Sequence, residues 1–569
     1  MLKLRLLSRA ILLALGLLSA CAARGLAVED PSPAGEAYGA FLEARFADSQ
    51  FALKEAAHYY RQASAADPTD PILRRQAFLA SFMAGDADAV PLAASVPDDP
   101  VATLLLIAEA ARQGAWPTAI SRIHSLPNDG LTQILSPLLL AWAEQGAGET
   151  DAALANLKPF VSGPGARGID VLHAALIADL AGRTAVAAQY YNLARKAFSN
   201  PNLQLARILA SWEARQGESD AASATLAALG TENSELAIVV PALEKDLSHR
   251  PVTRATDGMA EAFLAVAGSL RQQDSPDSSV VMLRLALALA PRLTPARLLL
   301  SDVFSSQQQP AAALAVLAPV PASDPLVALV DLRRAMLLDA VGKTDDALAL
   351  LKRVAARYPD MPQPKEVTGD ILRAHERWSE AIGAYDQAIA ELSPPRPSDW
   401  TLFYDRGIAY DQVHDWPKAE SDFRAALGLE PNQPYVLNYL GYSWAVQGRH
   451  LSEAREMVAK AAKLRPNDGA ILDSLGYVML RQGDVPGALQ WLLRAVTLEP
   501  DDATINGHLG DAYWAAGDKL QAWYQWQHAL TMHPSATEAA RLEAKLKRGF
   551  SQAEGSGVPT SSATPNHGP

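Results

Sequence analysis

The chain has 569 residues, of which 49% are hydrophobic and 20% are charged, and its formal net charge is -13. Nucleic acid and a broad contact with anionic lipid are excluded as expected partners, because both require basic patches that this balance does not supply. The sequence contains one cysteine, so no intramolecular disulfide can form and the fold must be stable through its own packing.

Residues 1–20 have the composition of a secretion signal. Lys3, Arg5 and Arg9 form a positive segment, and a short apolar run from Ala10 to Ala20 follows it. This run is shorter than the roughly 20 apolar residues that a membrane-spanning helix needs. The sequence therefore predicts a signal peptide over residues 1–20.

The single cysteine, Cys21, follows this signal in the sequence LSAC. A leucine, two small residues and a cysteine match the lipobox, and the segment resembles bacterial lipoprotein signals. The resemblance implies cleavage before Cys21 and acylation of that residue, and two or more acyl chains give durable membrane anchoring. Alternatively, Cys21 is an ordinary small residue near a signal-peptidase site, because SACA and CAA also fit a small-x-small pattern. By the same family analogy, Ala22 implies sorting to the outer membrane.

The rest of the chain is predicted to be helical. Apolar residues recur at spacings of three and four almost everywhere, and strand-like alternation is essentially missing. We expect a short flexible tether over residues 21–36 and divergent helical repeats over residues 37–257. A break at residues 245–258 is a candidate hinge.

A repeat of about 34 residues is evident in the second half of the chain. Four positions recur in four consecutive units, and the glycine position does so with steps of 34, 35 and 34 residues. The first three sets are small residues or closing prolines: Gly407, Gly441, Gly476 and Gly510; Ala419, Ala454, Ala488 and Ala522; Pro431, Pro466, Pro500 and Pro534. A fourth set is Ala426, Ala461, Ala495 and Ala529. Weaker matches extend the array back to residue 258.

These units resemble the tetratricopeptide repeat, in which two antiparallel helices cross at small residues. The resemblance implies an all-α fold, a right-handed superhelical solenoid of helix–turn–helix repeats, with a regular array over residues 258–534. Large residues on the second helices, such as Phe423, Val458, Leu492 and Trp526, are expected to fill the space between the helices. Residues 535–550 are predicted to form a polar capping helix, and residues 551–569 a disordered Ser, Gly and Pro-rich tail.

No catalytic constellation is found in the sequence. The eleven histidines show no paired ligand spacing, no G-x-S-x-G motif occurs, and GPGARG follows no predicted strand. We therefore expect a chain that is not an enzyme and that has no metal or other cofactor and no small-molecule substrate.

The first helices of tetratricopeptide repeats line a concave groove, and the family's contact positions lie three before, one after and four after the glycine position. Flat amphipathic side chains and acceptors at these positions suit an extended peptide or a protein surface. The predicted groove residues are Tyr404, Ile408, Asp411, Asn438, Tyr442, Asp473, Tyr477, Asp511 and Trp514, together with Ala445, Leu480 and Gly507. For each aromatic side chain, helix packing is the alternative role. An acidic lining favours basic or amide-rich partners.

The whole chain resembles a proteobacterial group of outer-membrane tetratricopeptide lipoproteins, through segments such as NYLGYSWAVQGRHLSEA and HLGDAYWAAGDKLQAWYQWQHAL. The resemblance implies a periplasm-facing, lipid-anchored scaffold that binds a carboxyl-terminal processing protease and its substrates, such as peptidoglycan hydrolases. A second hypothesis is an assembly factor for outer-membrane proteins, pili, exopolysaccharide or lipopolysaccharide. An enzyme with a site in the divergent half is a third hypothesis from a different class.

Overall fold

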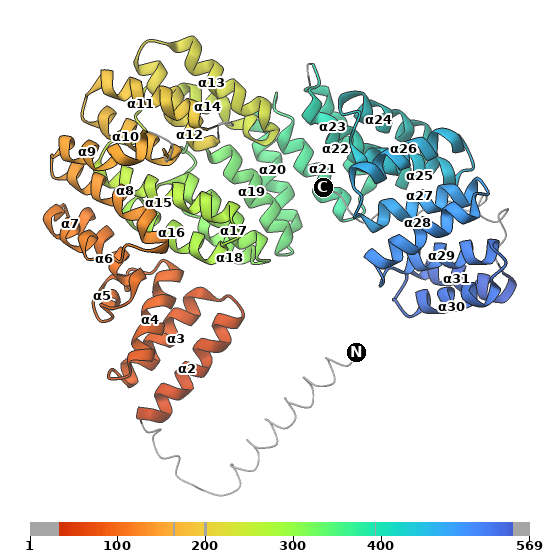
Figure 1. The fold of residues 1–569 in the computed structure, drawn as a ribbon, viewed down its shortest axis with the longest axis horizontal. Coiled ribbons are helices and arrows are strands. Elements are labelled where there is room, and N and C mark those ends of the chain that lie inside the picture. Colours follow the sequence, from red (N-terminus) through yellow and green to blue (C-terminus); the bar gives the residue numbers. More distant parts are fainter. Residues whose placement is uncertain (1–32, 163–165, 199–201, 393, 550–569) are drawn as a thin grey trace, which may run out of the picture. The chain divides into compact units, whose positions relative to one another are not determined.

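The computed structural model describes residues 33–162, 166–198, 202–392 and 394–549 of the chain. Within these residues every regular element is a helix, so the predicted all-α fold of helix–turn–helix repeats is confirmed (Figure 1). The predicted signal peptide, Cys21 and the predicted tail over residues 551–569 lie outside the described residues. The first described helix begins at Pro33, so residues 33–36 of the predicted tether are helical.

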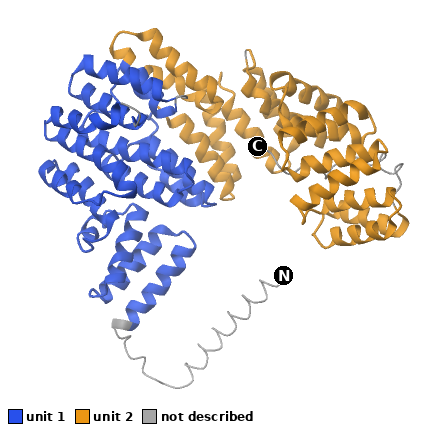
Figure 2. Cartoon of the chain, in the orientation of Figure 1, with its two compact units in different colours: residues 1–212, 248–324 blue, residues 213–247, 325–569 orange. Residues whose placement is uncertain are grey.

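The chain divides into two compact units, and neither is a single continuous segment (Figure 2). Unit 1 comprises residues 1–212 and 248–324, and unit 2 comprises residues 213–247 and 325–569. The division at residues 257 and 258 that the sequence predicts coincides with none of these boundaries. Residues 213–247 therefore belong to unit 2, although the segments before and after them belong to unit 1.

Unit 1 is built from two groups of helices, one before and one after residues 213–247. The helix α12 runs across the boundary at residue 212. The first group is α2 (Pro33–Ser49), α3 (Leu53–Ala66), α4 (Pro71–Ala84), α5 (Ala89–Ala93), α6 (Pro100–Arg112), α7 (Trp116–His124), α8 (Gly130–Gly146), α9 (Thr150–Val161), α10 (Gly168–Leu180), α11 (Thr184–Ala197) and α12 (Leu203–Arg215). The second group is α15 (Ala255–Gln272), α16 (Pro276–Leu289), α17 (Thr294–Ser306) and α18 (Pro310–Leu317).

Unit 2 consists of a short helical segment and a longer array. The segment contains α13 (Ser219–Glu232), the 3-10 helix η1 (Ser234–Val239) and α14 (Val240–Asp246). The array begins with α19 (Val327–Ala340), α20 (Thr344–Arg357), α21 (Gln363–Ala374), α22 (Trp378–Ala390), η2 (Pro397–Asp399), α23 (Trp400–Gln412) and α24 (Trp416–Leu429). It continues with α25 (Pro434–Val446), α26 (Leu451–Leu464), α27 (Gly469–Arg481), α28 (Val485–Leu498), α29 (Ala503–Ala515), α30 (Lys519–Leu530) and α31 (Ala536–Arg548), which is the predicted capping helix.

The recurring glycines lie where the two helices of a repeat cross most closely. A Cβ atom on Gly407 would lie 2.7 Å from Cε1 of Phe423, and one on Gly510 would lie 2.5 Å from Cδ1 of Trp526. Such distances are shorter than real Cβ contacts, so the crossing requires glycine. The same relation holds for Gly441 with Val458 and Gly476 with Leu492. The recurring alanines are fully buried: Ala419, Ala454, Ala488, Ala522, Ala426, Ala461, Ala495 and Ala529.

The turn after each first helix takes a left-handed residue, as the repeat requires. Gly448, Gly483 and Gly517 have φ values of 67°, 82° and 89°. Earlier repeats use Glu376 and His414, with φ values of 57° and 62°, in the equivalent turn. A side chain with a Cβ is strained in this region of φ and ψ, so these turns are less favourable than the glycine turns.

Unit 1 is held together by contacts between helices that lie far apart in the sequence. The fully buried indole of Trp142, on α8, donates from Nε1 to Nδ1 of His173 on α10, at 3.0 Å. The same indole packs on Gly258 of α15, where an added Cβ would lie 2.2 Å from the ring. Helix α16 also contacts α4 and α6. A repeat register does not dictate the contacts of α15 with α8 or of α16 with α4 and α6, because these helices lie far apart in the sequence.

Residues 213–247 pack against the first helices of the array in unit 2. Arg333 on α19 forms an ion pair with Glu235, at 2.9 Å. Gln363 at the start of α21 donates to the carbonyl of Ser234, at 2.6 Å, and Arg396 donates to the carbonyl of Gly230, at 2.7 Å. Polar contacts to three parts of the array thus fix this segment in unit 2.

None of the described helices combines the length and the hydropathy that crossing a membrane would require.

Candidate protein-binding face

The first helices of successive repeats in unit 2 lie side by side. Helix α25 contacts α27, α27 contacts α29, and α19 contacts α21, whereas the second helices of neighbouring repeats make no comparable contacts. A stack in which the first helices approach each other more closely than the second helices has its inner, concave side on the first helices. We call the surface formed by α21, α23, α25, α27, α29 and α31 the first-helix face.

Most of the predicted groove residues are buried in helix packing. Tyr404, Ile408 and Asn438 are 4%, 9% and 2% exposed. The ring of Tyr404 lies 6.0 Å from Phe423 and 6.1 Å from Tyr439, so it fills the space between α23, α24 and α25. The side chains at these positions therefore serve the core, which is the alternative role that the sequence left open for the aromatics.

Asp411 is half-buried and accepts a hydrogen bond from the hydroxyl of Tyr439, at 3.0 Å. Burial raises the pKa of its carboxyl group, and the hydrogen bond from Tyr439 opposes that rise. Asn438, on the same helix as Tyr439, has a buried Oδ1 without a hydrogen-bond partner among the described residues. The carboxylate of Asp411 and Oδ1 of Asn438 can therefore accept further hydrogen bonds near the first-helix face.

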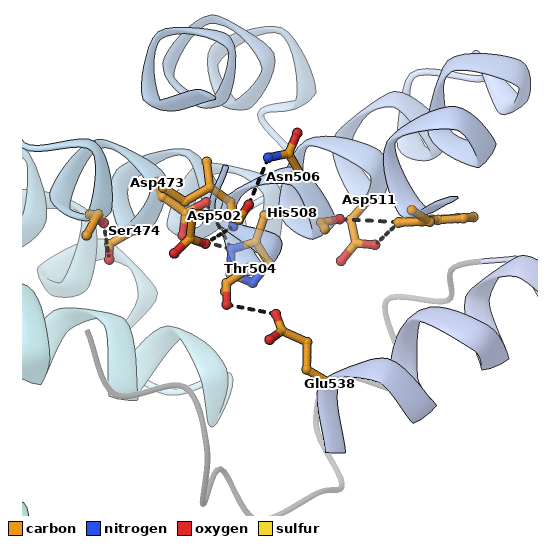
Figure 3. Close-up of polar contacts among 12 residues, drawn as sticks. Asp473, Ser474, Asp502, Thr504, Asn506, His508, Asp511 and Glu538 are labelled. Atoms are coloured by element: carbon orange, nitrogen blue, oxygen red, sulfur yellow. Dashed lines mark hydrogen bonds and ion pairs between the residues drawn. The ribbon is translucent and has the colours of Figure 1, made fainter. Parts of the chain in front are cut away.

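Three other predicted residues meet in an aromatic stack with a carboxylate beside it. The ring of Tyr442 lies 5.2 Å from Tyr477, which lies 4.6 Å from His508. The Nδ1 atom of His508 lies 2.8 Å from Oδ2 of Asp473 (Figure 3). Burial alone would lower the pKa of His508, but the carboxylates of Asp473 and Asp511 raise it above its usual value. The stack joins α25, α27 and α29.

His508 was not among the residues that the sequence predicted. It lies two positions before the glycine position, and the family's contact pattern covers offsets of three before, one after and four after that position. Tyr439 and Asp405 share this offset of two in their own repeats. A search for polar or aromatic side chains at that offset would have found all three.

Asp511 is used to hold the capping helix. Its Oδ1 accepts from Nε1 of Trp526, at 3.0 Å, and its Oδ2 lies 2.7 Å from Nζ of Lys545 on α31 (Figure 3). Thr504 donates to Glu538 of the same helix, at 2.7 Å. Both α31 residues lie 34 positions after their partners, so the cap continues the repeat register.

Trp514, the last predicted groove residue, is half-buried beside the end of the described chain. Its ring lies 5.5 Å from that of Trp526, and Nζ of Lys519 lies 5.2 Å from its centroid. Trp514 therefore packs in the cap of the array. Of the predicted residues, Tyr442, Tyr477 and Asp473 are brought together, and the others contribute to separate repeat contacts.

A cluster of carboxylates lies on the first-helix face at α21 and α23. Glu366, Asp370 and Arg373 occupy the three contact positions around Gly369, and Asp405 follows on α23. Arg373 is 3.4 Å from Asp405, and the hydroxyl of Tyr385 donates to Asp370, at 2.7 Å. We call Glu366, Asp370 and Asp405 the acidic cluster.

The charges of the acidic cluster are not balanced within unit 2. Burial, together with the neighbouring carboxylates, raises the pKa of Glu366 to about 8. Burial also raises the pKa of Asp405 to about 7, although Arg373 opposes this rise. The carboxyl group of Glu366 forms no hydrogen bond or ion pair with another described residue. Applying the contact offsets one repeat earlier in the sequence would have found this cluster.

No arrangement in the described part of the chain brings three or more histidine, cysteine or carboxylate side chains together in a way that could hold a metal ion.

Comparison with known proteins identifies the repeats. A family described as tetratricopeptide repeat matches residues 332–397 and 404–454, and one described as TPR repeat matches residues 476–517. The TPR repeat-containing protein PA4667 of Pseudomonas aeruginosa is 33% identical over 181 residues, which are 32% of this chain and 30% of that protein. Bacteriophage adsorption protein A of Escherichia coli is 39% identical over 100 residues, 18% of this chain and 10% of that protein.

Another relative is an enzyme. Human aspartyl/asparaginyl beta-hydroxylase is 24% identical over 205 residues, which are 33% of this chain and 26% of that protein. The chain thus spans less than a third of the length of each of these relatives.

Solved structures with a similar arrangement include two repeat proteins. The Cut9–Hcn1 hetero-tetramer of APC/C has a TM-score of 0.39 and 16% identity, and the match covers 91% of this chain and 98% of that one. YrrB, described as a TPR protein with an unusual peptide-binding site, has a TM-score of 0.28 and 18% identity over 34% of this chain and 97% of that one. With the family matches and the helix pairs described above, residues 332–397, 404–454 and 476–517 are tetratricopeptide repeats.

Proposed function

We propose that this chain is a non-enzymatic scaffold of the bacterial cell envelope that binds protein partners on the first-helix face of unit 2. The observation that carries the proposal is the acidic cluster on tetratricopeptide repeats, where Arg373 lies beside Asp405 and Asp370 and the carboxyl group of Glu366 has no ion-pair partner among the described residues. Tetratricopeptide repeats are protein-binding modules, and a site with unbalanced charge has a chemical preference for its partner.

The partner chemistry follows from the electrostatics of the cluster. A partner segment that places a lysine or arginine beside Glu366 supplies the positive charge that unit 2 lacks there. The nearby cation favours the ionised carboxylates, so binding lowers their pKa values toward the ordinary range. The release of protons on binding is therefore a signature of this contact, and basic, extended segments are the preferred partners.

The cellular setting comes from the lipobox at Cys21. A lipid on Cys21 would tether the scaffold to the outer membrane and expose the repeats to the periplasm. The proposed partners are a periplasmic protease, peptidoglycan hydrolases or both. Two partners bound to one chain meet as if in an intramolecular reaction, so the scaffold would act through effective concentration.

The test is a pull-down from detergent-solubilised membranes with the full-length chain and two variants. The charge variant is the pair Glu366→Gln and Asp405→Asn. The matched control is Glu456→Gln with Asp501→Asn, because both residues are exposed in the same unit. We expect the wild type and the control to recover a protease or a peptidoglycan hydrolase, and the charge variant to recover about tenfold less, since a buried charge pair contributes roughly 1.5–3 kcal/mol. Recovery of neither enzyme, or equal recovery by all three chains, would contradict the proposal.

The anchor is tested separately with Cys21→Ala. We expect this variant to leave the membrane fraction while its repeats still bind the same partners in detergent. A variant that stays in the membrane fraction would contradict the lipid anchor without affecting the binding proposal.

A further inference from the structure

Unit 1 contains a cavity of about 890 Å³. The segment before α3, together with α4, α5 and α6, forms one side, and α16, α17 and α18 form the other. Most of its lining is apolar, with Phe82, Leu105, Leu287 and Phe304 among the larger side chains. The volume lies within the range of small-molecule sites, which is about 300–1,000 Å³.

A positively charged side chain without a counterion lies in the wall of this cavity. Arg284, on α16, forms no hydrogen bond or ion pair with another described residue, and its Nε is shielded from solvent. Its guanidinium carbon lies 5.8 Å from the centroid of Phe304, so the negative face of the ring partly compensates its charge. Burial, together with the positive charge of the nearby Arg297, lowers the pKa of Arg284 to about 10. An unpaired buried charge is costly, so it marks a position where an anion would bind favourably.

A second arginine lies in the same cavity. Nε and Nη2 of Arg297 donate to the carbonyl of Pro291, at 3.1 and 2.8 Å, and Nη1 donates to the carbonyl of Val316, at 2.9 Å. These bonds fix the guanidinium in the wall without neutralising its charge. Burial lowers its pKa as well.

The carboxylates in the lining have other partners. Glu109 binds Arg112, with two contacts of 2.7 Å, and Asp86 binds Arg61, at 2.7 Å. Glu55 is exposed. Three arginines and Lys54 line the cavity, and of the arginines Arg112 is neutralised by Glu109, so Arg284 and Arg297 are the two without a carboxylate partner in the lining.

We propose that this cavity binds an amphiphilic anion, with a carboxylate or phosphate head group held by Arg284 and an unbranched apolar chain along the α4, α6 and α16 walls. The proposal concerns unit 1 and goes beyond the protein-binding function proposed for unit 2. The lining contains no serine, threonine, asparagine or glutamine. A peptide in this cavity would bury backbone amides without partners, whereas an acyl chain has no polar groups to satisfy.

The experiment measures binding to the full-length chain by calorimetry and by the shift in melting temperature. The probes are dodecanoate, dodecyl phosphate, dodecanol, inorganic phosphate and an apolar tripeptide with a free carboxylate. We expect dodecanoate or dodecyl phosphate to bind about tenfold or more tightly than dodecanol, because a hydrogen-bonded charge adds roughly 1.5–3 kcal/mol. Whichever head group binds more tightly identifies the ligand class.

Three variants make the test specific. Arg284→Met is expected to lose the preference for the anion over dodecanol, and Arg284→Lys is expected to retain part of it. Arg292→Met is the matched control, because Arg292 is exposed on the same side of unit 1 and does not line the cavity. Without ligand, Arg284→Met should melt at the same or a higher temperature than the wild type, since it removes an unpaired buried charge.

Four outcomes would overturn the proposal. They are equal binding of dodecanol, a preference for the anion that survives Arg284→Met, binding of inorganic phosphate as tight as that of dodecyl phosphate, and tighter binding of an apolar tripeptide with a free carboxylate. If Arg284→Met does not fold, the proposal is tested with Arg284→Lys and with the binding of the probes to the wild-type chain. Both measurements use the native fold.

Discussion

The two units use similar helices but are stabilised over different distances in the sequence. In the array of unit 2, each helix packs on its neighbours, as the crossings at Gly407 and Gly510 show. In unit 1, Trp142 of α8 contacts residues of both α10 and α15, which begins more than a hundred residues later. A repeat motif therefore predicts helix packing only in regions where the contacts join helices of the same repeat or of adjacent repeats.

The largest effect that would test this comparison is expected from Trp142→Ala and its counterpart Trp526→Ala. Both indoles are fully buried, and removing either should destabilise its unit by about 3–5 kcal/mol. In hydrogen exchange, Trp142→Ala should lower the protection of α8, α10 and α15 together. Trp526→Ala should lower the protection of α29, α30 and α31 alone, because neighbouring repeats contribute separately. Equally broad losses in both variants would break the comparison.

The two buried histidines should give the units opposite pH dependences. Burial lowers the pKa of His173 in unit 1 to about 3. Its folded state binds fewer protons than the unfolded state, so stability is complete above the unfolded pKa of 6.5 and falls below it. The loss at pH 5 is about 2 kcal/mol.

The pKa of His508 in unit 2 is raised instead, by Asp473 and Asp511 against the effects of burial and Lys545. Its contribution to stability is complete below pH 6.5 and is lost as the pH rises through the raised value. Urea unfolding at pH 5, 6.5 and 8 should show the acid loss disappear in His173→Gln and the alkaline loss disappear in His508→Gln. Unchanged pH profiles in these variants would contradict the assignments.

A smaller effect is expected from Gly407→Ala. The new Cβ would lie 2.7 Å from Phe423, and such overpacking costs about 1–3 kcal/mol, against about 0.5–1 kcal/mol gained from helix propensity. A net loss of about 1 kcal/mol should be measured in urea unfolding. Gly383→Ala is the control, because no atom lies within 4 Å of an added Cβ there, and it should be neutral or stabilising. Rescue of Gly407→Ala by Phe423→Leu would confirm the steric cause.

The smallest effect is expected at the turns. Glu376 has a φ of 57° in a position that later repeats give to glycine. Glu376→Gly relieves the strain of a left-handed residue and gains about 0.5 kcal/mol after the entropic cost of glycine. The melting temperature should rise by about 1–2 °C in a chain of this size. Gly483→Glu, the reverse change in a later repeat, should lower it.

Much of the fold could be predicted because the repeat imposes a register. The glycine, alanine and proline positions of four units place their helices and crossings correctly, and Lys545 shows that the cap continues the same spacing. The site was harder to predict, because contact positions of the family are also core positions here. Tyr404 and Asn438 are buried by neighbouring helices, and a sequence offset cannot tell a buried side chain from an exposed one.

The features of unit 1 could not be predicted from the sequence for a different reason. The cavity around Arg284 forms between α4, α6 and α16, which are brought together by packing and not by a repeat. The acidic cluster of unit 2 was missed for another reason: Glu366 and Asp370 occupy contact positions of the repeat that precedes the four most regular ones, and only Asp405 lies at an offset outside the family's contact pattern. The repeat pattern of the sequence thus does not tell which distant helices pack together, or which individual side chains are buried.

The division of the chain into discontinuous units has a practical consequence for dissecting it. The backbone passes between the two units at residues 212, 247 and 324, so no single cut separates them. A fragment that begins at residue 258 or 325 lacks Ser234 and Glu235, and it exposes the ends of α19 and α21 that those residues cover. A self-contained unit 2 requires residues 213–247 to be supplied as well, either by a circularly permuted chain or as a separate peptide that complements the array.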